Sequence, residues 1–491
     1  MNVRTRIAPS PTGGLHIGHV RTMLYDYALA NRHNGQFIVR IEDTDQKRYV
    51  EGAVENILKL IKAYGLNYNE GPDVDGDYAP YVQSQRLDLY IKYAKQLVDQ
   101  GHAYYCFMTP LETEELQKQS RLEGKKLRSP YRNKSKDEIQ ALINSGKEWV
   151  IRLKVPEDTE IEFEDAVLGK VKFNTNEVDD QILIKTDGFP TYHLAVVIDD
   201  HLMNITHILR GNDWLSSTPK HILLYRALGW EVPVIAHLPN LKEKDSSKKL
   251  SKRHGAVFAI QFLQEGYLPE ALLNFLMLLG WSSPLERKHG GKEKEIYSLK
   301  EFTDLFSLDR VQKTALVSFD REKLLWFNKE YVKSKTPSEL NNIFLNWYKE
   351  YCEEKLYSDF ILNDSLLEDK IALVKDRAST LKEILVQLGF FYNAPENIDW
   401  NIKQTENTRE IVKELKERFI KLFEGFSDNS AEWKHEDWEK HMRSIGDDFG
   451  KKHGDIFMVL RIAIVGSPFS PPLFEAMQIL GKAEVLKRLR A

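Results

Sequence analysis

The sequence predicts an α/β nucleotide-binding domain that carries an α+β insertion and is followed by an all-α domain. A strand pattern at residues 3–8 leads through a turn rich in glycine and proline into a helical pattern that ends near Arg32. Short strand patterns follow one another over residues 151–185. From residue 333 to the end the pattern is almost wholly helical. Because 491 residues exceed the usual size of one hydrophobic core, we expect about three or more domains.

The composition is that of an ordinary globular protein, with 42% hydrophobic and 29% charged residues. The net charge is −4, so any contact to a nucleic acid must come from a local basic surface. Two cysteines, Cys106 and Cys352, are too few for a disulfide framework or a four-cysteine zinc site, which indicates a reducing compartment. The N-terminus has no apolar signal core, and no stretch has the roughly 20 apolar residues of a membrane span. We therefore expect a cytoplasmic protein.

The turn at residues 9–19 lies between the first strand and the first helix. Free backbone N–H groups and the helix dipole favour an anion there, and the adjacent glycines allow a ligand to approach the backbone closely. His16 and His19 stand three residues apart, so both can face the same side of the first helical turn, and Gly18 leaves room for a flat ring. This arrangement suits a nucleoside triphosphate. Two polar side chains without a catalytic role, or a zinc site, are the alternatives, although the Glu of the helical zinc-protease motif is missing.

An acidic cluster follows the second predicted strand, residues 36–41. Ligands of open α/β sheets bind at the carboxyl ends of strands, which is where Glu42 to Asp45 fall. The alternative is a helix cap for the segment that begins at Val50. A second helix over about residues 51–64 completes a strand–helix–strand–helix unit.

Two motifs link the chain to a known family. The turn resembles the HIGH signature of class I aminoacyl-tRNA synthetases, and residues 6–13, Arg-Ile-Ala-Pro-Ser-Pro-Thr-Gly, resemble its glutamate-specific branch. Residues 242–255 alone would indicate only a solvated, lysine-rich loop. Residues 249–253, Lys-Leu-Ser-Lys-Arg, are however similar to the KMSKS motif that pairs with HIGH. With an insertion between the two motifs, the chain is identified as a member of the class I synthetases, of bacterial type, and as an enzyme.

The resemblance assigns a role to particular residues. It implies catalytic roles for His16, His19, Lys249 and Lys252, an ATP site of Gly18, Asp213, Leu241, Leu250, Ser251 and Lys252, and a glutamate site of Arg6, Ala8, Ser10, Glu42, Tyr192 and Arg210. A mobile loop can bring its lysines onto the triphosphate once ATP is bound, where they stabilise departing pyrophosphate. A planar, always charged guanidinium such as that of Arg6 suits a carboxylate that must be distinguished from an amide.

The resemblance also implies the cofactors. Mg²⁺ is expected to accompany ATP by bridging its phosphate oxygens. Many relatives carry a Cys-x-Cys zinc site in the insertion, but here Cys106 is followed by Phe, Met and Thr, so we expect no zinc and a core role for this cysteine. Many relatives have Asn where Val196 stands, which removes one polar contact expected at the substrate.

The implied organisation has five segments. They are a Rossmann-like catalytic domain in two halves (1–100 and 187–241), an insertion that grips the acceptor stem (101–186), the KMSKS loop with a stem-contact region (242–332), and an α-helical anticodon-binding domain (333–491). The sheet is expected to resume with residues 189–200 and 205–211, so Tyr192 has the alternative of a half-buried strand aromatic.

The predicted activity is ATP-dependent ligation of L-glutamate to the 3′ end of tRNA(Glu) through a glutamyl-adenylate, by a monomer without a membrane partner. The sequence leaves open the alternative that the enzyme also charges tRNA(Gln) with glutamate. A glutaminyl ligase is disfavoured, since its anticodon module is built of β-barrels, and a truncated paralogue that glutamylates a tRNA base lacks an anticodon domain. A regulator that has lost catalysis conflicts with the charged residues of both motifs. A nucleotidyltransferase would not explain the KMSKS loop.

Overall fold

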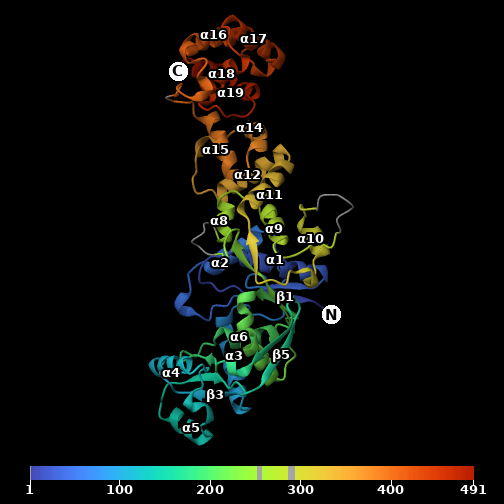
Figure 1. Cartoon of the computed structure of the whole chain (residues 1–491), viewed down its shortest axis with the longest axis vertical. Helices are drawn as coiled ribbons and strands as arrows, with labels where there is room; N and C mark the ends of the chain where they lie inside the picture. The colour runs from blue at the N-terminus through green and yellow to red at the C-terminus, as the bar shows by residue number, and fades with distance from the viewer. Residues whose placement is uncertain (1, 251–256, 286–293, 397) are drawn as a thin grey trace. The chain divides into compact units, whose positions relative to one another are not determined.

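The computed structural model describes residues 2–250, 257–285, 294–396 and 398–491. The chain forms two compact units (Figure 1). The first contains Met1–Gln261 and Leu273–Asp320, and the second contains Phe262–Leu272 and Arg321–Ala491. Within the described ranges, no helix is long and apolar enough to cross a membrane.

The first unit begins with the predicted strand–turn–helix. Strand β1 (Arg4–Ile7) is buried throughout, and helix α1 (Ile17–Arg32) ends at the predicted residue. Strand β2 (Gln36–Val39) pairs in parallel with β1, so the carboxyl ends of both strands point the same way. Buried apolar residues of α1, including Val20 and Leu24, cover this pair.

Strands β8 (His207–Gly211) and β9 (Val234–Leu238) form a second parallel pair in the first unit. The Thr206 N–H donates to the Arg4 carbonyl over 3.0 Å, which holds the start of β8 against β1. The remaining elements of this part are α2 (Ala53–Ala63), α3 (Leu87–Asp99), α6 (Tyr192–Leu202), α7 (Thr218–Leu228), β10 (Asn240–Glu243), α10 (Leu299–Leu305) and β11 (Leu316–Phe319). Helices α8 (Ala259–Gln264) and α9 (Pro269–Met277) have residues in both units.

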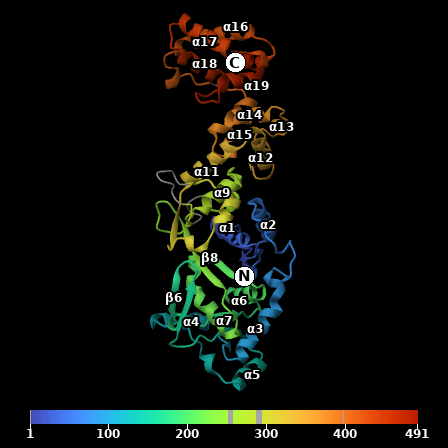
Figure 2. The ribbon, with the colours of Figure 1, turned by 90° about the vertical axis from the view of Figure 1, so that its right-hand side faces the viewer.

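The prediction that the sheet resumes at residues 189–200 is wrong, because residues 192–202 form helix α6. The run Leu194–Ile198 is apolar and buried on every side, packed among residues of α3 and α7 (Figure 2). A short continuous apolar run fits a buried strand and a buried helix equally well, so its pattern could not distinguish them. The second stretch, 205–211, does contain a strand, β8.

The inserted segment contains the predicted short strands. Strands β3 (Ala103–Cys106), β4 (Val150–Leu153) and β7 (Ile182–Ile184) form one antiparallel sheet. Helices α4 (Pro110–Leu122) and α5 (Lys136–Asn144) belong to the same part (Figure 1). Strands β5 (Glu160–Asp165) and β6 (Gly169–Asn174) form a hairpin, and Asp165 at the end of β5 pairs in parallel with Ile235 of β9. This last pairing attaches the hairpin to the nucleotide-binding fold.

Within the described residues, the second unit is helical, and it has two apolar clusters. Its helices are α11 (Arg321–Ser334), α12 (Pro337–Glu350), α13 (Ser358–Ile361), α14 (Leu367–Val374), α15 (Leu381–Tyr392), α16 (Val412–Glu424), α17 (His435–Asp448), α18 (His453–Val465) and α19 (Leu473–Arg490). Figure 2 shows α16 to α19 grouped together. On α16 the apolar residues Val412, Leu415, Phe419 and Phe423 recur at helical spacing and are buried. Burial of such side chains stabilises the unit by about 1.5–3 kcal/mol each.

Candidate active site

A cavity of about 1230 Å³ lies in the first unit, at the carboxyl ends of β1, β2 and β8. Eight of the predicted site residues line it: Arg6, Ala8, Ser10, His16, His19, Glu42, Tyr192 and Arg210. Five others lie outside this lining: Gly18, Asp213, Leu241, Lys249 and Leu250. Ser251 and Lys252 fall outside the described residues. The topology therefore collects residues that are up to about two hundred positions apart in the chain around one space.

The turn before α1 is held by the segment that follows the lysine-rich loop. The Ile17 N–H donates to the Val257 carbonyl, and the Ala259 N–H donates to the Leu15 carbonyl, both over 2.8 Å. The Phe258 ring lies 4.7 Å from the His16 ring. A Cβ added at Gly14 would lie 3.1 Å from the Phe258 ring, so a larger residue there would require the ring to shift by a few tenths of an ångström. No local pattern singles out Phe258, because its partner His16 is more than 240 residues away in the chain.

The histidine pair occupies the first turn of α1. The His16 N–H donates to His19 Nδ1 over 3.4 Å, and the two ring centroids lie 6.0 Å apart. The pKa of His19 is lowered to about 4, mainly by desolvation and also by the charges of His16 and Lys249, while the charge of Asp213 opposes this shift. The ring is nevertheless exposed to the open cavity. His19 is therefore neutral at pH 7 and can donate one hydrogen bond to a ligand.

Backbone pairing brings the start of the lysine-rich loop next to strand β10. The Leu250 N–H donates to the Leu241 carbonyl over 2.7 Å, so these two predicted ATP-site residues are adjacent. Lys249 Nζ lies 2.7 Å from Asp213 Oδ2, which follows β8. The side chain of Lys249 is 57% exposed and that of Asp213 is 45% exposed, so this ion pair is weak. Lys249 can therefore turn to another anion.

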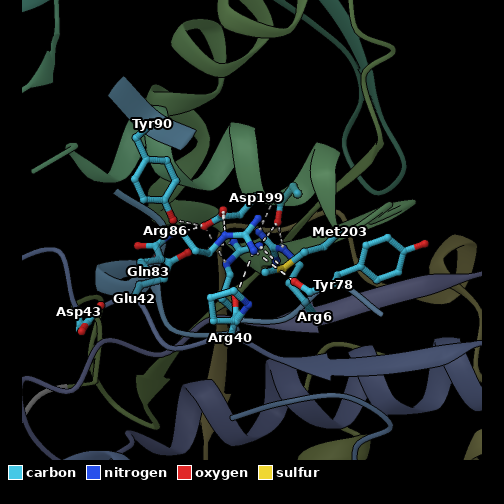
Figure 3. Close-up of polar contacts among 12 residues, drawn as sticks. Arg6, Arg40, Glu42, Asp43, Tyr78, Gln83, Arg86, Tyr90, Asp199 and Met203 are labelled. Atoms are coloured by element: carbon cyan, nitrogen blue, oxygen red, sulfur yellow. Dashed lines mark hydrogen bonds and ion pairs between the residues drawn. The ribbon is translucent and has the colours of Figure 1, made fainter. Parts of the chain in front are cut away.

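Beside Arg6, the cavity wall contains a buried network of charges (Figure 3). Arg6 donates from Nε and Nη2 to the two oxygens of Asp200, over 2.9 and 3.1 Å. Arg40 donates to Asp200 over 2.7 Å and to Glu42 over 3.0 Å. The other members are Arg86 and Asp199, joined at 2.8 Å. Three arginines thus face three carboxylates, and the network is neutral as a whole.

Two groups of this network face the cavity. Arg6 Nη1 makes no hydrogen bond within the described part of the chain, so one edge of the guanidinium can bind a ligand. Burial raises the pKa of Glu42, although Arg40 opposes the shift. A cationic ligand group beside Glu42 would stabilise the carboxylate further.

Arg210, at the end of β8, also lines the cavity and is buried, but its partners differ from those of Arg6. It donates to His237 Nε2 (3.2 Å), His221 Nδ1 (3.0 Å), Thr218 Oγ1 (2.6 Å) and, more weakly, the Tyr192 hydroxyl (3.5 Å). Burial lowers the pKa of both histidines, and the charge of Arg210 lowers it further. No carboxylate of the described residues forms an ion pair with Arg210, so its positive charge is available to an anionic ligand.

Sequence reasoning missed two residues of this site besides Phe258. Trp214 lines the cavity and its ring lies 4.5 Å from that of Tyr192. Asp200 accepts hydrogen bonds from Arg6. In the sequence it follows Asp199 and an apolar run, and two acidic residues in that position could have indicated a buried ion pair. Val196 is buried in the core cluster and lies outside the cavity lining.

No cluster of three His, Cys, Asp or Glu side chains that could hold a metal ion occurs among the described residues. Cys106 is buried, with its Sγ 3.2 Å from Ser129 Oγ. These two facts describe the side chains of the protein. They do not bear on a metal ion that binds together with a ligand.

Comparison with known families agrees with this geometry. Residues 2–326 match the model of the catalytic domain of class I tRNA synthetases (E and Q), and residues 343–491 match that of an anticodon binding domain. The chain therefore belongs to the class I tRNA synthetases of the glutamate and glutamine group. The family and the fold class predicted from the sequence are confirmed.

Individual relatives resemble the chain over its whole length. A glutamate–tRNA ligase of Clostridioides difficile (strain 630) is 41% identical, and the alignment covers 100% of this chain and 98% of that protein. A glutamate–tRNA ligase of Chlorobium chlorochromatii (strain CaD3) is 42% identical over 99% of this chain and 97% of that protein. The crystal structure of a glutamate tRNA ligase from Elizabethkingia meningosepticum, in complex with its amino acid, has a TM-score of 0.82 at 34% identity, covering 100% of this chain and 99% of that one.

Proposed function

We propose that the chain ligates L-glutamate to the 3′ end of tRNA(Glu) at the expense of ATP. The observation that carries this proposal is the cavity, which presents the unneutralised guanidinium of Arg210 and the free edge of Arg6 to one ligand, next to the histidine pair. Two cations suit a substrate with a side-chain carboxylate, and Glu42 suits its amino group. The full-length relatives named glutamate–tRNA ligase support the same substrate.

In the first step an oxygen of the glutamate α-carboxylate attacks the α-phosphorus of ATP. A carboxyl–phosphorus bond forms, the bond from the α-phosphorus to the bridging oxygen breaks, and pyrophosphate leaves with the electron pair. His16 and His19 donate hydrogen bonds to the phosphate oxygens, and the loop lysines, Lys249 and Lys252, stabilise the leaving group. Arg6, Ala8, Ser10, Glu42, Tyr192 and Arg210 hold glutamate, while Gly18, Asp213, Leu241, Leu250 and Ser251 surround ATP.

In the second step a terminal ribose hydroxyl of the tRNA attacks the adenylate carbonyl and AMP leaves. We assign that end of the tRNA to the insertion, residues 101–186; Arg152 of β4 and Lys185, directly after β7, line the cavity and support this assignment. Residues 333–491 bind the anticodon, and their helices argue against a glutaminyl ligase. As a charging enzyme the protein acts in the cytoplasm, as a monomer.

Mg²⁺ bound with ATP would neutralise part of the charge of its phosphates. Among the described residues no His, Cys, Asp or Glu cluster could hold a metal ion, so we assign no ligand of this chain to it. Zinc is not required, since Cys106 is packed against Ser129 and no second cysteine stands near it in sequence.

The test is a charging assay with radiolabelled glutamate or glutamine and each purified tRNA, tRNA(Glu) and tRNA(Gln). Glutamate on tRNA(Glu) alone is expected for a discriminating enzyme, and glutamate on both tRNAs identifies the non-discriminating kind. Charging with glutamine, or no charging, would contradict the proposal.

Replacement of Lys252 by Ala should slow adenylate formation by about 10²–10³-fold, because one stabiliser of the departing pyrophosphate is lost. ATP–pyrophosphate exchange in the presence of tRNA measures this step, and filter binding should show that tRNA affinity persists. Lys248→Ala is the matched control, since it removes an exposed lysine next to the motif. Equal exchange rates for the two variants would remove Lys252 from the mechanism.

A further inference from the structure

The partners of Arg210 impose definite protonation states on two histidines. A guanidinium can only donate, so the nitrogens that face it, His237 Nε2 and His221 Nδ1, must both accept. The proton of His237 is then on Nδ1, which donates to Asp165 Oδ2 over 2.6 Å. The proton of His221 is on Nε2, which donates to His193 Nδ1 over 3.1 Å.

Asp165 fixes the first of these rings. It accepts hydrogen bonds from the backbone N–H groups of Val167 (3.0 Å), Leu168 (2.9 Å) and His237 itself (3.2 Å), besides that from the ring. Burial opposes ionisation of Asp165, but these hydrogen bonds hold its pKa below the ordinary value, so it is a carboxylate. A carboxylate with four donors cannot turn away, and the imidazole on it is locked in one tautomer and one orientation.

None of these three partners touches the cavity. Arg210 lines it, whereas His221, His237 and Asp165 lie outside the lining. The histidines accept hydrogen bonds without adding a negative charge, and the carboxylate stands one residue further away, behind His237. Direct pairing of Arg210 with a carboxylate would fix the guanidinium equally well but would cancel the charge that a substrate carboxylate needs.

We propose that His237, held by Asp165, is a positioning residue for Arg210 that orients the guanidinium toward the substrate carboxylate while leaving its charge uncancelled. The inference rests on the proposed function, since it assigns Arg210 to the glutamate side chain. It adds that a residue of the insertion, at the end of β5, sets the affinity for the amino acid through His237 (Figure 1).

The test compares Michaelis constants for the three substrates in the charging reaction. In Asp165→Asn and His237→Leu the KM for glutamate should rise about tenfold or more, since the guanidinium loses its fixed orientation. The KM values for ATP and tRNA should change by less than about twofold, because neither ligand depends on Arg210. His237→Gln, which retains an acceptor of similar reach, should restore part of the affinity for glutamate.

Asp180→Asn is the matched control for loss of a buried carboxylate. Asp180 also lies in the insertion and also accepts from buried donors, Tyr104 and Arg132, but it has no contact with Arg210 or its histidines. It should lower the melting temperature about as much as Asp165→Asn does and leave the KM for glutamate near that of the unaltered chain. If Asp165→Asn does not fold, the His237→Leu and His237→Gln pair decides.

A double-variant cycle separates positioning from general damage. In an Arg210→Lys background, Asp165→Asn should raise the KM for glutamate no further, because the lysine cannot make the contact to His237 Nε2. An equal rise with and without Arg210 would overturn the inference, as would unchanged KM values in Asp165→Asn and His237→Leu. Failure of the unaltered chain to charge any tRNA with glutamate would instead overturn the proposed function, and the inference with it.

Discussion

Arg6 and Arg210 both line the cavity and both are buried, yet the residues around them compensate their charges in opposite ways. Arg6 shares Asp200 with Arg40 in a network of equal numbers of cations and carboxylates. Arg210 is held by two neutral imidazoles and a hydroxyl. Breaking a buried ion pair is strongly destabilising, whereas an uncompensated buried cation contributes no such stability. We therefore infer that the residues around Arg6 mainly stabilise the fold, whereas those around Arg210 mainly select the ligand.

The largest effect is expected at Arg210. Arg210→Gln should lower kcat/KM for glutamate by about a hundred- to a thousandfold, since a charge-assisted contact to the substrate is lost. The free energy of unfolding should fall little or rise, because the variant also removes an unpaired buried charge. Charging kinetics and urea unfolding measure the two quantities. A large loss of stability would contradict the contrast between the surroundings of the two arginines.

The residues around Arg6 should respond the other way. Asp200→Asn leaves the guanidinium groups of Arg6 and Arg40 without their shared carboxylate, which should cost about 3–5 kcal/mol of unfolding free energy. The KM for glutamate should rise less than in Arg210→Gln. Urea unfolding monitored by tryptophan fluorescence checks the stability, and a variant as stable as the unaltered chain would show that the network is dispensable.

The smallest effect concerns pH. Because burial raises the pKa of Glu42, this group takes up a proton at a higher pH than an ordinary glutamate, and the neutral form cannot pair with the substrate ammonium. The KM for glutamate should therefore increase as the pH falls into the acid range. Glu42→Gln should have a higher KM with a flatter pH dependence. An equally steep dependence in that variant would assign the titration to another group.

Local sequence patterns predicted the strand and the helix on either side of the turn at residues 9–19, and the helices that follow residue 333, because these elements depend on spacing within one segment. They failed at residues 192–202, where burial on all sides erases the periodicity that distinguishes a helix from a strand. For the site, resemblance supplied Arg6 and Arg210, but it gave no information on what compensates each charge.

The compensating residues could not be predicted because they come from distant segments. Asp200 is 194 residues from Arg6, and Asp165 is 72 residues from His237. No spacing in the sequence predicts either contact, since the proximity of the residues depends on how α6 and β5 pack in the folded chain. A sequence shows the donors and acceptors, whereas only the fold shows which of them meet.

The place of Asp165 at the end of β5 limits how this part of the chain can be exchanged. If the insertion of one relative replaced that of another, the β5–β6 hairpin would be exchanged with it. The residues that the hairpin contacts, in β9 and at His237, would still come from the original chain. A chimaera that carries another residue at position 165 is therefore expected to bind glutamate more weakly, whatever its tRNA contacts. Exchange of the insertion would therefore also alter a residue that supports the amino-acid site.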